Sequence, residues 1–169
     1  MLYNTAYGRA IASVLRGDPC GVDVKAGPFF RLAFIWAVDE RLGIIRVTRV
    51  VNAVAAGRII NTKTAASQIM GSVVWGIGMA LHEETLVDHN FGRIMNANIA
   101  EYHVPVNADV QDIKIIFVDE PDRTVNPLGI KGVGEIGIVG VAAAIANAVY
   151  HATGKRVRDL PITIDKIFR

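Results

Sequence analysis

The sequence contains a single cysteine, Cys20, among its 169 residues. One cysteine excludes an internal disulfide framework and any iron–sulfur or zinc site built from several thiolates. The histidines, His82, His89, His103 and His151, lack the HExxH-type spacing that places two zinc ligands on one helix. We therefore expect no metal ion held by side-chain ligands of this chain.

Charge is also scarce, because only 20% of the residues are Asp, Glu, Lys or Arg and the formal net charge is +2. The one basic cluster, at 155–158, is followed at once by Asp159. Nucleic-acid binding needs a basic patch or stripe, so we expect none. The apolar fraction of 51% is high enough to build a core, and it also suggests surface that another molecule covers.

Targeting and membrane signals are missing as well. Residues 1–6 lack the charged and apolar regions of a signal peptide. The longest apolar runs, 69–81 and 136–150, fall short of the ~20 residues that span a bilayer. We expect no membrane span and a cytoplasmic location by default. A periplasmic location is the alternative if a partner subunit carries an export signal.

The pattern of helix and strand signals predicts an α+β fold. Helical and hairpin segments occur in blocks, without the regular β-α-β alternation of a parallel sheet. The polar stretch 39–43 ends in glycine and joins two apolar, β-branched runs, which is typical of a hairpin. We predict one domain over 1–169 with a helix at 5–16, a hairpin at 29–54, a long helix at 61–84, a strand at 113–118, a glycine loop at 129–135 and a helix at 136–151.

The glycine loop, 129–135, ends in one carboxylate, Glu135. The apolar run that follows has helical composition, so Glu135 is expected at a helix N-terminus, where the helix dipole favours an ionised side chain. Glycines would also let the backbone approach a bulky ligand closely. From the residues alone, Glu135 is either a general base beside a cofactor or a carboxylate that only complements the dipole, and the second is favoured.

Residues 132–137 also match the GxGxxG pattern of dinucleotide-binding proteins. That interpretation requires a strand that ends directly before the first glycine, whereas the nearest expected strand ends at Val118. It would also put Glu135 where a pyrophosphate should lie. A dinucleotide-binding module is therefore a minor alternative.

The long helix at 61–84 contains Gly71, Gly76 and Gly78. Each costs up to ~1 kcal/mol relative to alanine in a helix interior, so the helix is expected to pack closely against another backbone or against a cofactor. Gln68 lies in the same apolar helix and would cost roughly 1–3 kcal/mol to bury without partners. Its amide either bridges backbone groups or holds a polar cofactor.

Several segments together resemble a known family. Residues 68–84, QIMGSVVWGIGMALHEE, resemble the glutamine-led helix of the molybdopterin-binding subunits of the xanthine dehydrogenase and aldehyde oxidoreductase family. Residues 98–105, which end in Tyr-x-x-Pro, resemble the segment that follows, and 131–135, KGVGE, resemble the catalytic glutamate motif. Residues 126–129 and 152–161 are most similar to bacterial aromatic-aldehyde oxidoreductases. The resemblance covers nearly the whole chain and corresponds to the C-terminal portion of a larger subunit.

This resemblance implies a molybdenum hydroxylase that oxidises an aldehyde, or hydroxylates an N-heterocycle, with oxygen derived from water. It implies that Glu135 is the base that removes a proton from a hydroxyl on molybdenum. It also implies that the cofactor is molybdenum-molybdopterin, with the cytosine dinucleotide form as one alternative. The residues implied to contact this cofactor are Gln68, Lys131, Gly132, Val133 and Gly134.

The resemblance further implies an incomplete domain, inactive by itself, whose partners are the remainder of the molybdenum subunit, an iron–sulfur subunit with 2Fe–2S clusters and an FAD subunit. A non-catalytic remnant that only packs or binds is the alternative. The chain departs from the family at three places. Members often have aspartate before the glycine that matches Gly57, proline after the asparagine that matches Asn61, and a second glycine where this chain has Ser72; here Ala55 lies two positions before Gly57 and Thr62 follows Asn61.

Overall fold

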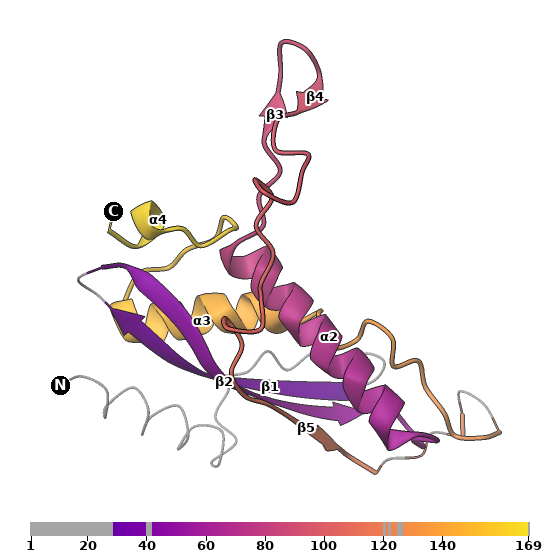
Figure 1. Ribbon diagram of the computed structural model, residues 1–169. Helices are drawn as coiled ribbons and strands as arrows, with labels where there is room; N and C mark the ends of the chain where they lie inside the picture. The colour runs from indigo at the N-terminus through magenta and orange to yellow at the C-terminus, as the bar shows by residue number, and fades with distance from the viewer. Residues whose placement is uncertain (1–28, 40–41, 120, 122, 125–126, 169) are drawn as a thin grey trace.

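The computed structural model describes residues 29–39, 42–119, 121, 123–124 and 127–168, and shows an α+β fold (Figure 1). The helix expected at 5–16 and Cys20 lie outside the described residues. The elements are β1 (Phe29–Asp39), β2 (Ile44–Ala55), α2 (Thr62–Leu81), β3 (Val87–Asp88), β4 (Arg93–Ile94), β5 (Ile113–Phe117), α3 (Val141–Thr153) and α4 (Ile164–Phe168).

A three-stranded sheet of order β1-β2-β5 forms the base of the fold. β1 and β2 pair antiparallel, with a register shift between Ile35 and Trp36. Their turn contains Gly43 at a φ of 63°, whose N–H donates to the Asp39 carbonyl at 2.7 Å. β5 pairs parallel to β2. Two parallel neighbouring strands need a long crossover connection. Here α2 and the segment after it form the connection between β2 and β5.

α2 begins at Thr62 because Asn61 caps it. The Asn61 side chain accepts hydrogen bonds from the N–H groups of Lys63 at 3.0 Å and Thr64 at 3.2 Å, as N-cap residues do. The helix ends at Leu81 rather than at the expected 84. The N–H groups of the next two residues both donate to the Gly78 carbonyl, which turns the chain away from the helix axis.

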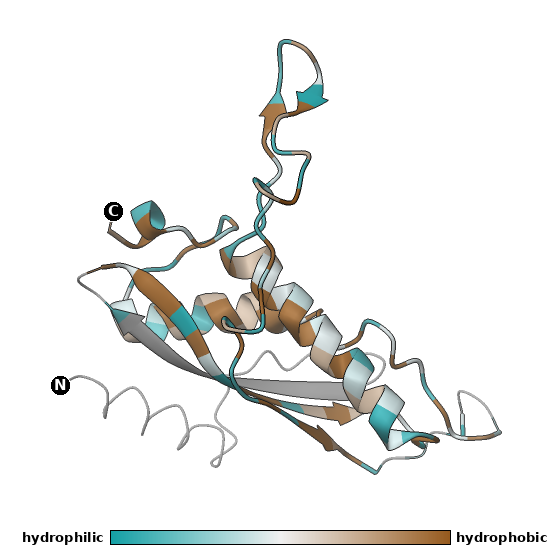
Figure 2. Cartoon of the chain, in the orientation of Figure 1, coloured by the Kyte–Doolittle hydropathy of each residue, from teal (hydrophilic) through white to brown (hydrophobic). Residues whose placement is uncertain are grey.

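The core lies between the sheet and the helices α2 and α3, which pack against each other, with α3 over β1 and α2 over β5 (Figures 1 and 2). Its fully buried side chains include Val50 and Val54 of β2, Ile69, Val73 and Ile77 of α2, and Val141, Ile145 and Val149 of α3. Among the described residues, α2 is the one helix long and apolar enough to cross a membrane. Core helices share that composition, and the buried α2 residues make it part of this core.

α3 begins at Val141, not at 136 as the apolar run suggested. Two glycines in the run lower helix propensity, and Gly137 is pressed against α2, where an added Cβ would lie 3.1 Å from the Ile69 carbonyl oxygen. Turn hydrogen bonds fill the interval, from Ile138 N–H to the Glu135 carbonyl at 3.2 Å and from Val141 N–H to the Ile138 carbonyl at 3.0 Å. Glu135 is therefore not at the N-terminus of α3, and the helix-dipole argument does not apply to it.

Residues 83–106 form an arm that projects from the end of α2 and carries the small β3–β4 hairpin (Figure 1). Asn96 holds the base of the arm, because its side chain accepts from Leu86 N–H at 2.9 Å and donates to the Glu84 carbonyl at 2.6 Å. Hydrophobic stretches alternate with hydrophilic ones along the arm (Figure 2). Large apolar side chains of the arm are exposed, including Phe91 at 78% and Ile99 at 85%. The arm thus presents apolar surface outside the core.

Candidate functional site

Gln68 and Glu135, far apart in the sequence, line the same hollow, which has a volume of about 700 Å³. We call it the site hollow. Its walls come from α2, from the end of the glycine loop and from the base of the arm. Both side chains are exposed to it, so the cost expected for burying Gln68 does not arise. The lining residues are Gln68, Gly71, Ser72, Val74, Trp75, Glu83, Val104, Pro105, Gly134 and Glu135.

The other predicted cofactor contacts lie beside the site hollow rather than on its wall. Lys131 is half-buried and Gly132 is exposed. Val133 is half-buried and packs against the core. Of the four residues predicted from the KGVG stretch, only Gly134 is among the lining residues.

The start of the glycine loop is held by the end of β2. The Arg58 N–H donates to the Gly129 carbonyl at 2.7 Å, and the Lys131 N–H donates to the Ala56 carbonyl at 3.2 Å. Gly57, between them, has a φ of 69°, and an added Cβ there would overlap the Gly129 carbonyl oxygen. Only glycine combines this left-handed backbone with such a close approach. The connection from hairpin to helix is therefore well held despite the departures at 55 and 62.

Ser72 holds the other end of the loop. Its hydroxyl lies 2.9 Å from the Gln68 carbonyl oxygen and 3.1 Å from the Gly134 carbonyl oxygen, and the residue is 4% exposed. In the sequence, Ser72 is evident only as a departure from the family pattern. The available signal was its position one helical turn after Gln68, where a side chain shares the same face.

The three glycines of α2 serve different contacts. At Gly76, an added Cβ would overlap the side chain of Val141, so this glycine brings α2 and α3 together. At Gly78, the added atom would overlap the Glu83 carboxylate and lie 2.8 Å from Pro105. At Gly71, it would meet nothing within 4 Å, and this glycine lies on the site hollow. Close packing therefore accounts for Gly76 and Gly78, whereas Gly71 leaves the backbone open to the site hollow.

Glu83 follows the apolar run of α2, a position typical of a solvated helix end, but it is half-buried and lines the site hollow. The Tyr102 hydroxyl donates to its Oε2 at 3.1 Å. This hydrogen bond to Glu83, and after it burial and the Glu83 charge, raise the pKa of the Tyr102 phenol above its ordinary value. Tyr102 thereby joins the arm to the wall of the site hollow.

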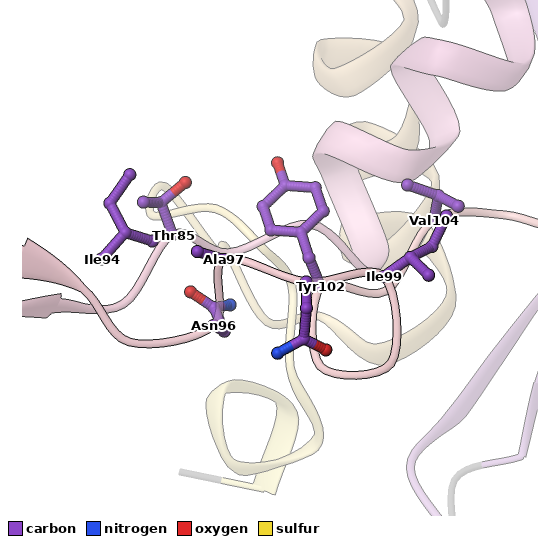
Figure 3. A pocket seen from close by; sticks show the side chains of 8 residues that line it. Thr85, Ile94, Asn96, Ala97, Ile99, Tyr102 and Val104 are labelled. Carbon is purple, nitrogen blue, oxygen red and sulfur yellow. The ribbon is translucent and has the colours of Figure 1, made fainter.

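A second hollow, of about 420 Å³, lies on the arm itself (Figure 3). Of the polar residues in this segment that could line a pocket, Asn96, Asn98 and Tyr102 line this hollow, whereas Glu101 and His103 do not. Val104 lines both hollows. Within the part of the chain that the structure describes, no group of three or more His, Cys, Asp or Glu side chains is arranged to hold a metal ion at either place.

Comparisons with known proteins identify the family. A family model described as "Molybdopterin cofactor-binding domain" matches residues 30–111. The chain is 52% identical over 130 residues to the aldehyde oxidoreductase molybdenum-binding subunit PaoC of Escherichia coli (strain K12), covering 77% of this chain and 18% of PaoC. It is 35% identical over 142 residues to the putative xanthine dehydrogenase molybdenum-binding subunit XdhA of the same strain, covering 83% of this chain and 19% of XdhA. The chain belongs to the xanthine dehydrogenase and aldehyde oxidoreductase family of molybdopterin-binding subunits.

The fold of this family is also seen in the solved structures. Quinoline 2-oxidoreductase from Pseudomonas putida 86 superposes with a TM-score of 0.77 at 32% identity, over 84% of this chain and 18% of that one. The family resemblance found in the sequence is thus confirmed. The chain spans less than a fifth of the length of PaoC and XdhA.

Within this molybdopterin-binding family, the matched range 30–111 includes Gln68 and the arm but not the glycine loop. The structure brings that loop to Gln68. It also lacks the strand that a dinucleotide fingerprint needs, because among the described residues the last strand before Gly132 is β5, which ends at Phe117.

Proposed function

We propose that this chain forms one side of a molybdopterin-binding active site in a molybdenum hydroxylase, and that Glu135 is its catalytic base. The observation that carries the proposal is the meeting of Gln68 and Glu135 in one hollow. The substrate class is an aldehyde, with an N-heterocycle as the alternative. The similarity to PaoC, which is named as an aldehyde oxidoreductase subunit, favours the aldehyde.

The site hollow fits an extended polar cofactor. Its volume lies within the roughly 300–1,000 Å³ usual for ligand sites. Gly71 and Gly134 leave open space where a side chain would otherwise stand, so a ligand can approach the backbone of both walls. The Gln68 amide can both donate and accept hydrogen bonds at the same wall.

The residues of the site have different proposed roles. Glu135 has an exposed carboxylate that, among the described residues, takes part in no hydrogen bond or ion pair, so its oxygens are available to accept a proton. Gln68 orients the cofactor through its amide, and Lys131, Gly132, Val133 and Gly134 provide backbone beside it. When bound, the molybdenum cofactor supplies the two-electron redox chemistry and a hydroxyl of lowered pKa. A positioned carboxylate base typically contributes 10²–10⁴-fold to the rate.

We propose further that the chain acts as one part of a larger assembly. The remainder of a molybdenum subunit would supply the other cofactor contacts, and iron–sulfur and FAD subunits would take up the electrons. Exposed apolar side chains support this, including Trp75 at 56% on the site hollow and Ile99 at 85% on the arm. Large apolar side chains such as these contribute favourable free energy when a partner removes them from water.

The test is co-expression of the chain with its neighbouring gene products, followed by measurement of molybdenum, pterin and aldehyde oxidation. We expect Glu135→Gln to keep its molybdenum and to lose turnover by about 10²–10⁴-fold. Glu84→Gln is the matched control, because Glu84 is an exposed carboxylate that does not line the site hollow. Full turnover in Glu135→Gln would show that the base is wrongly assigned. Absence of molybdenum from the complete assembly would favour a non-catalytic remnant.

A further inference from the structure

The geometry points to Ser72 as a positioning residue that sets where Glu135 stands relative to Gln68. This inference rests on the proposed function, since it assigns a role to a residue that supports the proposed base. Ser72 itself lies on α2, one turn after Gln68. It contacts Glu135 through the backbone of the preceding residue, Gly134.

The first contact is the hydroxyl. It lies within hydrogen-bond distance of two carbonyl oxygens, that of Gln68 at 2.9 Å and that of Gly134 at 3.1 Å. A serine hydroxyl has one hydrogen and donates to one carbonyl at a time or shares the hydrogen between them. Either way, the same buried group joins the backbone of Gln68 to the backbone next to Glu135. At 4% exposure, water has little access to replace it.

The second contact is steric. Gly137 is buried against Ser72, and a Cβ added to Gly137 would lie 2.8 Å from the Ser72 Cβ. Two residues that flank Glu135 therefore contact Ser72. Gly134 does so through its carbonyl oxygen, and Gly137 by close packing. These two contacts restrict movement of the intervening residues along α2. Glu135, between them, faces the site hollow that Gln68 also lines.

This arrangement affects a base strongly. A general base must lie within about one hydrogen bond of the proton that it accepts, and a displacement of about 1 Å can reduce a rate by about 10²-fold. The Ser72 hydroxyl supplies such control through the two backbone carbonyl oxygens that it contacts. Its loss should therefore lower the rate of the chemical step more than it weakens substrate binding.

The experiment compares Ser72→Ala with Ser67→Ala in the complex assembled with the co-expressed partners. Ser67 is an exposed serine on the same helix, so it is a matched control. Hydrogen exchange of peptides covering 129–140 reports the loop directly, and steady-state kinetics give kcat and KM separately. In Ser72→Ala we expect faster exchange over 133–138, a kcat lowered roughly 10- to 100-fold, a KM within about twofold and unchanged molybdenum content. Ser67→Ala should match the unmodified chain.

The outcomes separate this inference from the proposed function. Exchange and kcat at unmodified levels in Ser72→Ala overturn the positioning role, even if Glu135→Gln abolishes turnover. A rise in KM with constant kcat also overturns it, because that pattern reports substrate binding. If Glu135→Gln keeps full turnover, the proposed base is wrong, and faster exchange in Ser72→Ala still supports the link between α2 and the loop.

Discussion

Gly57 is the position where one added methyl group should disturb the glycine loop most. Its φ of 69° lies in the left-handed region, and an added Cβ would overlap the Gly129 carbonyl oxygen, which is backbone and cannot rotate away. Gly57→Ala therefore combines two effects. It strains the residue itself, and it forces apart the end of β2 and the start of the glycine loop.

The magnitude follows from both effects. The left-handed conformation costs an L-residue roughly 1–2 kcal/mol. Separating the two segments weakens the hydrogen bonds from Arg58 to Gly129, at 2.7 Å, and from Lys131 to Ala56, at 3.2 Å, each with a net contribution of ~0.5–1.5 kcal/mol. We expect Gly57→Ala to lower the free energy of unfolding by about 2–5 kcal/mol.

Gly154→Ala is the control. Gly154 follows α3 with a φ of 72°, and an added Cβ there meets nothing within 4 Å. It should lose only the strain of roughly 1–2 kcal/mol. Urea unfolding followed by circular dichroism measures both variants, with equal m-values required for the comparison. Equal losses in the two variants would refute the close contact between Gly57 and Gly129.

Three further outcomes are expected. Gly76→Ala should cost about 1–3 kcal/mol by overpacking against α3, whereas Gly71→Ala, open to the site hollow, should gain up to ~1 kcal/mol; urea titration of the pair measures the difference. Asn52→Leu should stabilise the fold by ~1–3 kcal/mol, because buried Asn52 has two amide atoms without partners among the described residues; a destabilisation would contradict this. Ultraviolet titration should find the pKa of Tyr102 above its ordinary value of 10.0, and Glu83→Gln should lower the pKa of Tyr102. The Tyr102 pKa is higher in the folded protein than in the unfolded chain. The hydrogen bond from Tyr102 to Glu83 therefore stabilises the fold fully below pH 10.0, and this stabilisation is lost as pH rises through the pKa of the folded protein.

Much of the fold could be predicted from local patterns. β1 and β2 occupy the segment where two apolar runs flank a polar turn, and α2 begins directly after Asn61, a residue type that caps helices. The end of α2 and the start of α3 could not be predicted in this way. At both places the backbone lies close to residues distant in sequence, Pro105 beside Gly78 and Ile69 beside Gly137.

The candidate site divides in the same manner. The motifs point to Gln68 and Glu135, and these two residues remain proposals for the cofactor contact and the base. The sequence does not point to Glu83, because it follows an apolar helix, where an exposed carboxylate is the common case. Its partner Tyr102 reaches it only because the arm folds back beside the end of α2.

The sequence by itself determined the family, since the order of the glutamine-led helix, the Tyr-x-x-Pro segment and the glycine loop is a property of the chain. Only the tertiary structure decided how these segments meet. Ser72 joins α2 to Gly134, and the end of β2 holds Gly129, through hydrogen bonds between residues far apart in the sequence. Short-range patterns report helix and strand because those depend on neighbouring residues. The position of Glu135 depends instead on backbone contacts across the fold, at glycines where any side chain would prevent the approach.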